Sequence, residues 1–158
     1  MQERGVIKAY AIGGGIATLY YIEPTLTYDL DIFFIPTEEK LDILSPIYRY
    51  LEKEGHRADK EHILIEGVPV QFIPVYNELI KEAVENAIES KYRGVKTRIL
   101  RAEYLLAIAL QTFRSKDRER VIKFLEETKI DKKYLGKILK RHRLHEKFRD
   151  FREKYYEK

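Results

Sequence analysis

The sequence predicts an α/β (α+β) fold, in which a small mixed sheet with its helices is followed by a segment of helices alone. Up to about residue 100, short runs rich in β-branched and aromatic residues alternate with helical patterns and with glycine or proline breaks. From residue 101 onward, every apolar pattern has the helical period. We therefore expect an α/β core over residues 1–100 and a helical extension over residues 101–158 that packs on this core.

The length and composition are typical of a folded globular protein. Of the 158 residues, 44% are hydrophobic and 35% are charged, and a chain of this kind can bury a sizeable core. The absence of cysteine excludes disulfides, thiol nucleophiles and thiolate metal sites. Because no signal-peptide or membrane-span pattern is found, we expect a cytoplasmic protein with no membrane partner. Abundant Glu, Lys, Arg and Ile beside few Asn and Gln indicate a thermophilic source.

The first predicted elements are a strand, a glycine turn and a short helix. Residues 1–5 resemble the last turn of a helix, so we expect either an earlier natural start or a reduced first helix. Residues 8–12 alternate like a strand and lead into glycines, after which residues 16–21 are predicted to be helical. Residues 28–35 form a β-rich run that a proline ends.

A helix, a hairpin and a second helix are predicted next. Thr37 is expected to cap a helix that continues to residue 54. Strand-like runs over 61–65 and 68–75 flank a turn in which the glycine can adopt positive φ. Asn77 is expected to cap a helix that reaches about residue 90. The remaining elements are expected to be a short strand over 97–100 and helices over about 101–113, 116–128, 131–141 and 143–156.

Two aspartates, Asp29 and Asp31, lie in an otherwise apolar strand pattern. Because strand side chains alternate between faces, both aspartates are expected on one face, with Leu30 and Ile32 in the core on the other. Two carboxylates this close repel each other unless they share a cation, and hard oxygen ligands suit Mg²⁺ held together with substrate phosphates. We therefore predict a Mg²⁺ site at Asp29 and Asp31, although a strand-end pair of this kind can also cap loops or bind an incidental cation.

Three consecutive glycines, Gly13, Gly14 and Gly15, precede the aspartates. Residues without Cβ let backbone N–H groups approach an anion closely, so this turn is a candidate phosphate site. It is not a P-loop, because no Lys-Ser or Lys-Thr follows, and it is not a dinucleotide fingerprint, because Thr18 stands where the third glycine would be.

The combination of Gly14-Gly15, thirteen residues and then Asp29-Leu30-Asp31-Ile32 resembles the signature of the nucleotidyltransferase superfamily, which includes DNA polymerase β and the tRNA CCA-adding enzymes. The stretches GVPVQFIPVYNELIKEAVENA, RAEYLLAIALQTFRSKDRERV and LGKILKRHRL resemble small prokaryotic members related to abortive-infection type toxins. The resemblance implies metal-dependent transfer of a nucleoside monophosphate from an NTP, such as ATP, to a protein or RNA hydroxyl.

The resemblance also assigns roles to individual residues. It implies that the glycine turn holds the nucleotide phosphates, that Asp29 and Asp31 bind up to two metal ions, and that Thr27 helps to orient the aspartates. A third carboxylate is expected on the strand VPVQFIPV, where this chain has Gln71. Glutamine is a poorer cation ligand and cannot accept the proton of an acceptor hydroxyl, so the metal bound through the triphosphate is the more certain one.

Gln71 therefore supports a second hypothesis. The protein would then be a catalytically degenerate nucleotidyltransferase-fold binding module, such as one half of a toxin–antitoxin pair. If the protein is instead an active nucleotidyltransferase, a nearby acid, Glu66 or Asp59, takes over the role of the third carboxylate.

The stretch FRSKDRERV has two interpretations. In the toxin-like relatives that it resembles, a basic-plus-Asp motif lies near the nucleotide, which implies that Lys116 contacts the triphosphate. A helix N-terminus with solvated charges explains the same residues, with Asp117 in the first turn and the arginines paired to Glu119, Glu126 and Glu127.

The C-terminal segment 132–158 carries eleven basic residues against four acidic ones, which supports a third hypothesis of nucleic-acid association. A solvated helix surface explains the charge equally well. Interleaved aromatic residues are more consistent with a helix that packs on the body through Ile138, Leu139, Leu144, Phe148 and Phe151. We do not expect His142 and His145 to bind metal, and we expect His56 and His62 at the surface.

Overall fold

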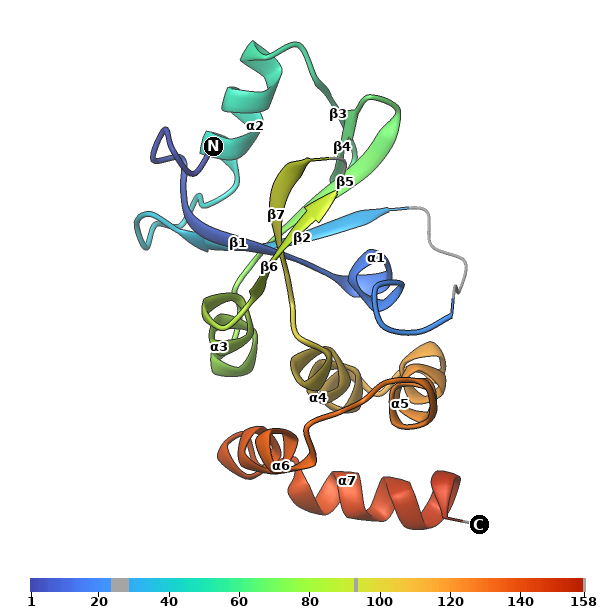
Figure 1. Cartoon of the computed structure of the whole chain (residues 1–158). Helices are drawn as coiled ribbons and strands as arrows, with labels where there is room; N and C mark the ends of the chain where they lie inside the picture. The colour runs from blue at the N-terminus through green and yellow to red at the C-terminus, as the bar shows by residue number, and fades with distance from the viewer. Residues whose placement is uncertain (24–28, 93, 158) are drawn as a thin grey trace.

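A seven-stranded mixed sheet forms the centre of the computed structural model, which describes residues 1–23, 29–92 and 94–157 (Figure 1). The strand order is β3-β4-β5-β2-β1-β7-β6, in which β2 pairs with β5 and β1 with β7 in parallel, and the other neighbours are antiparallel. The strands are β1 (Ile7–Gly13), β2 (Leu30–Pro36), β3 (Arg57–Asp59), β4 (His62–Ile65), β5 (Val68–Pro74), β6 (Ile88–Tyr92) and β7 (Val95–Ile99).

The helices cover the two faces of the sheet unequally. Helix α2 lies on one face, and α3 with the C-terminal helices lies on the other (Figure 1). A π-helical turn, Arg152–Tyr156, extends the last helix. The helices are α1 (Gly14–Thr18), α2 (Ser45–Lys53), α3 (Glu78–Glu85), α4 (Ala102–Thr112), α5 (Ser115–Glu127), α6 (Lys132–Arg141) and α7 (His145–Phe151).

Alternation along β2 divides the core into two clusters. Phe34 packs with Ile47 and Leu51 under α2, and Leu30 and Ile32 pack against the edge of the same cluster. Phe33 points to the opposite face and joins the larger cluster formed with α3 to α7. Asp31 lies two residues before Phe33 and is therefore on the same face, so the pleat of the strand directs its carboxylate toward the C-terminal helices.

The predicted mixed sheet followed by helices is confirmed, and so is the hairpin between β4 and β5. Glu66 has φ 50° and Gly67 has φ 81°, as a two-residue hairpin turn with two positive φ values requires. The four C-terminal helices lie within two residues of their predicted limits, apart from the last, which begins at His145 and changes to a π-helical turn after Phe151. Residues 1–5 form one turn closed by hydrogen bonds from Gly5 N–H to Gln2 O and from Val6 N–H to Met1 O.

The predicted helix over residues 37–54 is wrong in its first half, because α2 begins only at Ser45. Pro46 lacks an N–H group and is tolerated in the first turn of a helix but not in its interior, so the helix begins beside it. The Thr37 hydroxyl donates to Gly5 O at 3.0 Å instead of capping a helix, and Asp42 accepts a hydrogen bond from Ser45 N–H at 3.0 Å.

The predicted helix over residues 77–90 is too long. Asn77 caps α3 as expected, since its Oδ1 accepts from Ile80 N–H at 2.9 Å, but the helix ends at Glu85. Residues 88–92 form β6, which pairs with β7 on the edge of the sheet. Pairing with the following strand outweighs the helical pattern of Ala87 and Ile88, which local periodicity alone cannot reveal.

In the described part of the chain, no helix combines the length and the apolar character that crossing a membrane requires.

Candidate active site

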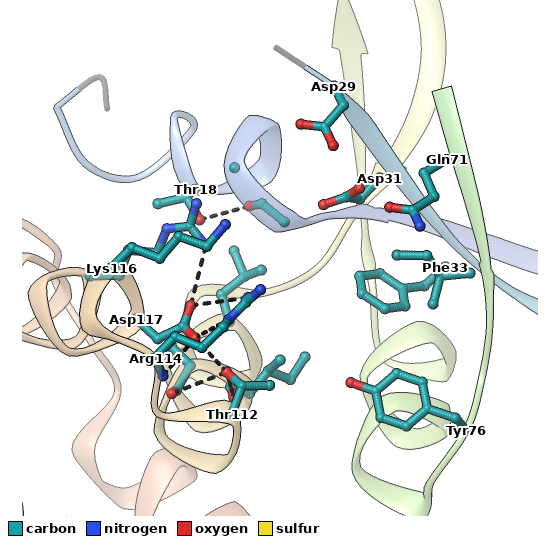
Figure 2. A pocket seen from close by; sticks show the side chains of 17 residues that line it. Thr18, Asp29, Asp31, Phe33, Gln71, Tyr76, Thr112, Arg114, Lys116 and Asp117 are labelled. Carbon is teal, nitrogen blue, oxygen red and sulfur yellow. Dashed lines mark hydrogen bonds and ion pairs between the residues drawn. The ribbon is translucent and has the colours of Figure 1, made fainter. Parts of the chain in front are cut away.

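A cavity of about 710 Å³ lies between the sheet face that carries Asp31 and the helices α4 and α5 (Figure 2). Its two ends differ in chemistry. One end is polar and is lined by Gly14, Gly15, Asp29, Asp31, Lys116 and Arg120. The other end carries the apolar side chains of Phe33, Ile73, Leu105, Ile108 and Ala109, and Tyr76, Thr112 and Arg114 add polar groups there. A ligand with an anionic part and a flat apolar part would match both ends.

The glycine turn brings backbone directly against the carboxylate of Asp31. Gly14 has φ +58°, and a Cβ added there would lie 1.9 Å from Asp31 Oδ2. A Cβ at Gly13 would lie 2.3 Å from the Phe33 ring, so Gly13 packs against the sheet, while Gly14 and Gly15 line the cavity. The Thr18 hydroxyl donates to Gly14 O at 2.8 Å and fixes the turn. These contacts leave room for glycine alone.

Asp29 and Asp31 both line the polar end of the cavity. Burial, followed by the negative charge of Asp29, raises the pKa of Asp31 above its usual value, while Lys116, Arg120 and His62 act in the opposite direction. Asp31 Oδ1 is buried and has no hydrogen-bond partner among the described residues. The carboxylate is therefore held close to cationic groups without being neutralised by a direct contact.

Gln71 lies immediately beside Asp31. β2 and β5 are parallel neighbours in which Asp31 is paired with Gln71, and both residues line the cavity (Figure 2). The position where the superfamily resemblance leads us to expect a third carboxylate therefore faces the cavity but carries a neutral amide. Among the residues that line the cavity, neither Asp59 nor Glu66 is found. Neither acid thus stands in for the missing carboxylate.

His62, which the sequence analysis places at the surface, lies instead beside Asp29. Its Nε2 is 3.4 Å from Asp29 Oδ2, and its side chain is only 22% exposed. The β4–β5 hairpin pairs Ile63 with Val70, so the same register continued outward places His62 level with Gln71. This signal was present in the sequence, because the Glu66-Gly67 turn fixes the register from the turn outward.

The opposite wall of the cavity is basic and comes from the start of α5. Lys116, which Figure 2 labels, lines the cavity, and so does Arg120. Asp117 is buried and accepts hydrogen bonds from Thr112 Oγ1 at 2.9 Å and from Arg114 Nε at 2.7 Å. Burial acts to raise the pKa of Asp117, but these hydrogen bonds outweigh it and hold the pKa below its usual value.

The helix-start interpretation of FRSKDRERV holds in part, and the contact of Lys116 with a triphosphate stays a prediction. Asp117 fixes the helix start, and Arg114 and Arg120 pair with Asp117 rather than with the predicted glutamates. Lys116 is left to face the cavity. Thr27, the residue expected to orient the aspartates, lies outside the described residues.

The donor set at the polar end fits a divalent cation only in combination with further oxygen ligands. Asp29 and Asp31 supply hard carboxylate oxygens, and the unpartnered Asp31 Oδ1 is the kind of atom that a cation would satisfy. Within the described ranges, no three His, Asp or Glu side chains converge as a ready-made metal cluster. Phosphate oxygens of a bound nucleotide, or water molecules in its absence, would complete the coordination.

The comparisons with known proteins support the fold. The chain is similar in structure to an antigenic nucleotidyltransferase-like protein from Paracoccidioides brasiliensis, with a TM-score of 0.54 and 14% sequence identity. The similarity covers 89% of this chain and 84% of that one. No protein-family model matches the sequence, and no curated protein is significantly similar to it. At this level of identity the comparison shows a shared nucleotidyltransferase-like fold and leaves the chemistry to the residues of the cavity.

Proposed function

We propose that the protein binds a nucleoside triphosphate with a divalent cation in the cavity and transfers the nucleoside monophosphate to a hydroxyl of a protein or an RNA. The observation that carries this proposal is the convergence of three segments far apart in sequence on one polar end. These segments are the glycine turn, the Asp29–Asp31 pair and the basic start of α5. Such an end offers close backbone approach, cation ligands and positive charge to a polyphosphate.

Each group has a separate role in this reaction. Lys116 and Arg120 bind phosphate oxygens and balance their charge, and the apolar end receives the nucleobase. The bound cation supplies charge neutralisation and alignment of the triphosphate. The acceptor oxygen forms a bond to the α-phosphorus while the bond to the bridging oxygen breaks, pyrophosphate leaves with the electron pair, and the hydroxyl proton passes to solvent. Positioning and electrostatics supply most of the acceleration.

Thermal melting with Mg²⁺ and each NTP tests the binding step. A ligand at a concentration one hundred times its Kd stabilises the folded state by about 2.7 kcal/mol, which should raise the melting temperature by several degrees. Asp31→Asn should abolish this shift. Burial raises the pKa of Asp31, so at a pH above the unfolded-state pKa the ionised carboxylate destabilises the folded protein. Without ligand, Asp31→Asn should therefore melt at the wild-type temperature or above it.

Transfer is tested with NTPs labelled at the α-phosphate. The proposal expects label on a macromolecule in the presence of wild-type protein and none with Asp31→Asn. A wild-type protein that shows no shift with any NTP would rule out the proposal as a whole. A shift without label on any protein or RNA acceptor would leave nucleotide binding and remove the transfer reaction.

Gln71 favours a second candidate function. Its amide stands beside Asp31 where a carboxylate would be needed to help activate an acceptor, so the protein would be a nucleotide-binding module that acts through a partner, such as a cognate toxin or antitoxin. Gln71→Asp should then create transfer activity or strengthen cation binding. Efficient transfer by the native protein would contradict this alternative.

A further inference from the structure

The sheet directs a nitrogen donor toward the two carboxylates. His62 is the first residue of β4, which is separated from β2 by β5 alone. Ile63 and Val70 of the hairpin both pack under α2, so His62 and Gln71 point to the opposite face, toward Asp31. A row of side chains from β4, β5 and β2 thus crosses this face of the sheet. Asp31 and Gln71 of this row line the cavity, and His62 lies beside Asp29, which also lines it.

Two atoms of this row are buried without a hydrogen-bond partner in the described part of the chain, His62 Nε2 and Asp31 Oδ1. A buried polar atom without a partner is costly, and a bound ion is one way to satisfy it. Nε2 lies 3.4 Å from Asp29 Oδ2 without forming a hydrogen bond. Two donors that bind one small dication at about 2.1 Å and at a right angle lie about 3 Å apart, so the observed separation is close to that of two ligands of one ion.

We propose that His62 takes the place of the missing third carboxylate as a protein ligand of the cation at Asp29 and Asp31, and that the site therefore selects a first-row transition dication such as Mn²⁺ over Mg²⁺. This inference rests on the cation site of the proposed function and specifies its metal. The three side chains do not surround one point without the ion, so binding draws them together by side-chain rotation on strands that the sheet holds in place.

The chemistry of the donor set determines the selectivity. Mg²⁺ binds oxygen ligands and retains several waters, whereas imidazole nitrogen is a ligand of transition dications. Gln71 adds at most a neutral oxygen, so the exchange of a carboxylate for an imidazole lowers the charge of the site and changes its donor type. The alternative is an ion pair between His62 and Asp29, in which no nitrogen of the protein would bind the cation.

Mn²⁺ alone is the probe, added to the full chain of the wild type, His62→Ala and His62→Asp, with His145→Ala as the matched control on the distant helix α7. Affinity is measured from the EPR signal of free Mn²⁺ and by competition with Mg²⁺. The wild type should bind Mn²⁺ at least about tenfold more tightly than Mg²⁺, and His62→Ala should lose about tenfold or more of the Mn²⁺ affinity. His62→Asp should restore binding of Mg²⁺.

Pulsed EPR provides a direct measurement on the wild type, so the proposal does not depend on whether a variant folds. A ¹⁴N coupling to bound Mn²⁺ is expected in the wild type and in His145→Ala, and it should disappear in His62→Ala and His62→Asp. Bound Mn²⁺ without this coupling, no Mn²⁺ uptake by the wild type, or equal affinities for Mn²⁺ and Mg²⁺ would overturn the proposal.

The two proposals fail in different experiments. An NTP-induced melting shift that depends on Asp31 but not on His62 would keep the nucleotide site and remove the role of His62. A nitrogen-coupled Mn²⁺ site in a protein that no NTP stabilises would keep His62 as a ligand and remove the proposed nucleotide function.

Discussion

The space beside Gly14 holds the carboxylate of Asp31, and a side chain at position 14 would occupy the same space. The carboxylate is there because Asp31 is on the cavity face of β2, and it is packed against Gly14, the first residue of α1. This single contact couples the stability of the turn to the position of the candidate cation ligand. The glycine is therefore required by a close approach as well as by its positive φ.

We expect Gly14→Ala to lower the free energy of unfolding by about 2 kcal/mol, because the new Cβ would collide with Asp31 Oδ2 in a backbone conformation with φ +58°. It should also displace Asp31 and remove any melting shift caused by an NTP. The matched control is Gly136→Ala in α6, where a Cβ meets no atom within 4 Å and where alanine should stabilise the helix by about 0.5–1 kcal/mol. Urea unfolding measures both variants, and equal effects would show that Gly14 is not constrained as described.

At the level of elements, Glu82 joins three helices. It projects from α3, accepts a hydrogen bond from Tyr104 Oη of α4 at 2.7 Å, and pairs with His142 Nε2 at 2.8 Å and with Arg141 at the end of α6. Burial acts to raise the pKa of Glu82, but the hydrogen bonds from Tyr104 and His142 outweigh it and lower the pKa. His142 thus holds the helical extension against α3.

Glu82→Gln should lower the free energy of unfolding by about 1–3 kcal/mol at neutral pH, because His142 and Arg141 lose their charged partner. The folded-state pKa of Glu82 is depressed, so its contribution is present above the unfolded-state pKa and is lost as the pH falls through the folded-state pKa. The difference from the wild type should therefore shrink in acid. Urea unfolding at pH 7 and at pH 3 measures the difference in the free energy of unfolding between Glu82→Gln and the wild type. Glu85→Gln, at an exposed position of the same helix, is the control. A difference that is the same at both pH values would contradict the proposed role of the Glu82 carboxylate.

For the whole molecule, the larger core cluster extends over both the sheet and the C-terminal helices. Leu106 and Leu110 of α4 are fully buried together with Ala11 of β1 and Leu100, which follows β7. The apolar stripe predicted for the last helices is buried at Ile138, Leu139, Leu144 and Phe151 and partly buried at Phe148, so these residues pack. Of the Lys and Arg residues between 132 and 157, all are exposed except the half-buried Lys147, so most of the positive charge of this segment lies on the outside of this packing.

A fragment of residues 1–100 should not fold, because it lacks the α4 side chains that complete the core and the helical wall of the cavity. Thermal unfolding followed by circular dichroism should show no cooperative transition for the fragment and a single transition for the whole chain. A fragment that ends at residue 131 serves as the comparison, since it retains α4 and α5. Cooperative melting of the 1–100 fragment would show that the α/β core is independent.

Local patterns in the sequence were enough to predict the order of most elements, the hairpin and the face of β2 that carries Asp31, with Asp29 directly before the strand. These features depend on strand alternation, caps and turn residues, which act over a few positions. The tertiary structure decided where α2 begins, that residues 88–92 form an edge strand, that Gln71 and Lys116 line one cavity, and that His62 lies beside Asp29. Strand pairing and packing between distant segments set these features, and no local period encodes them.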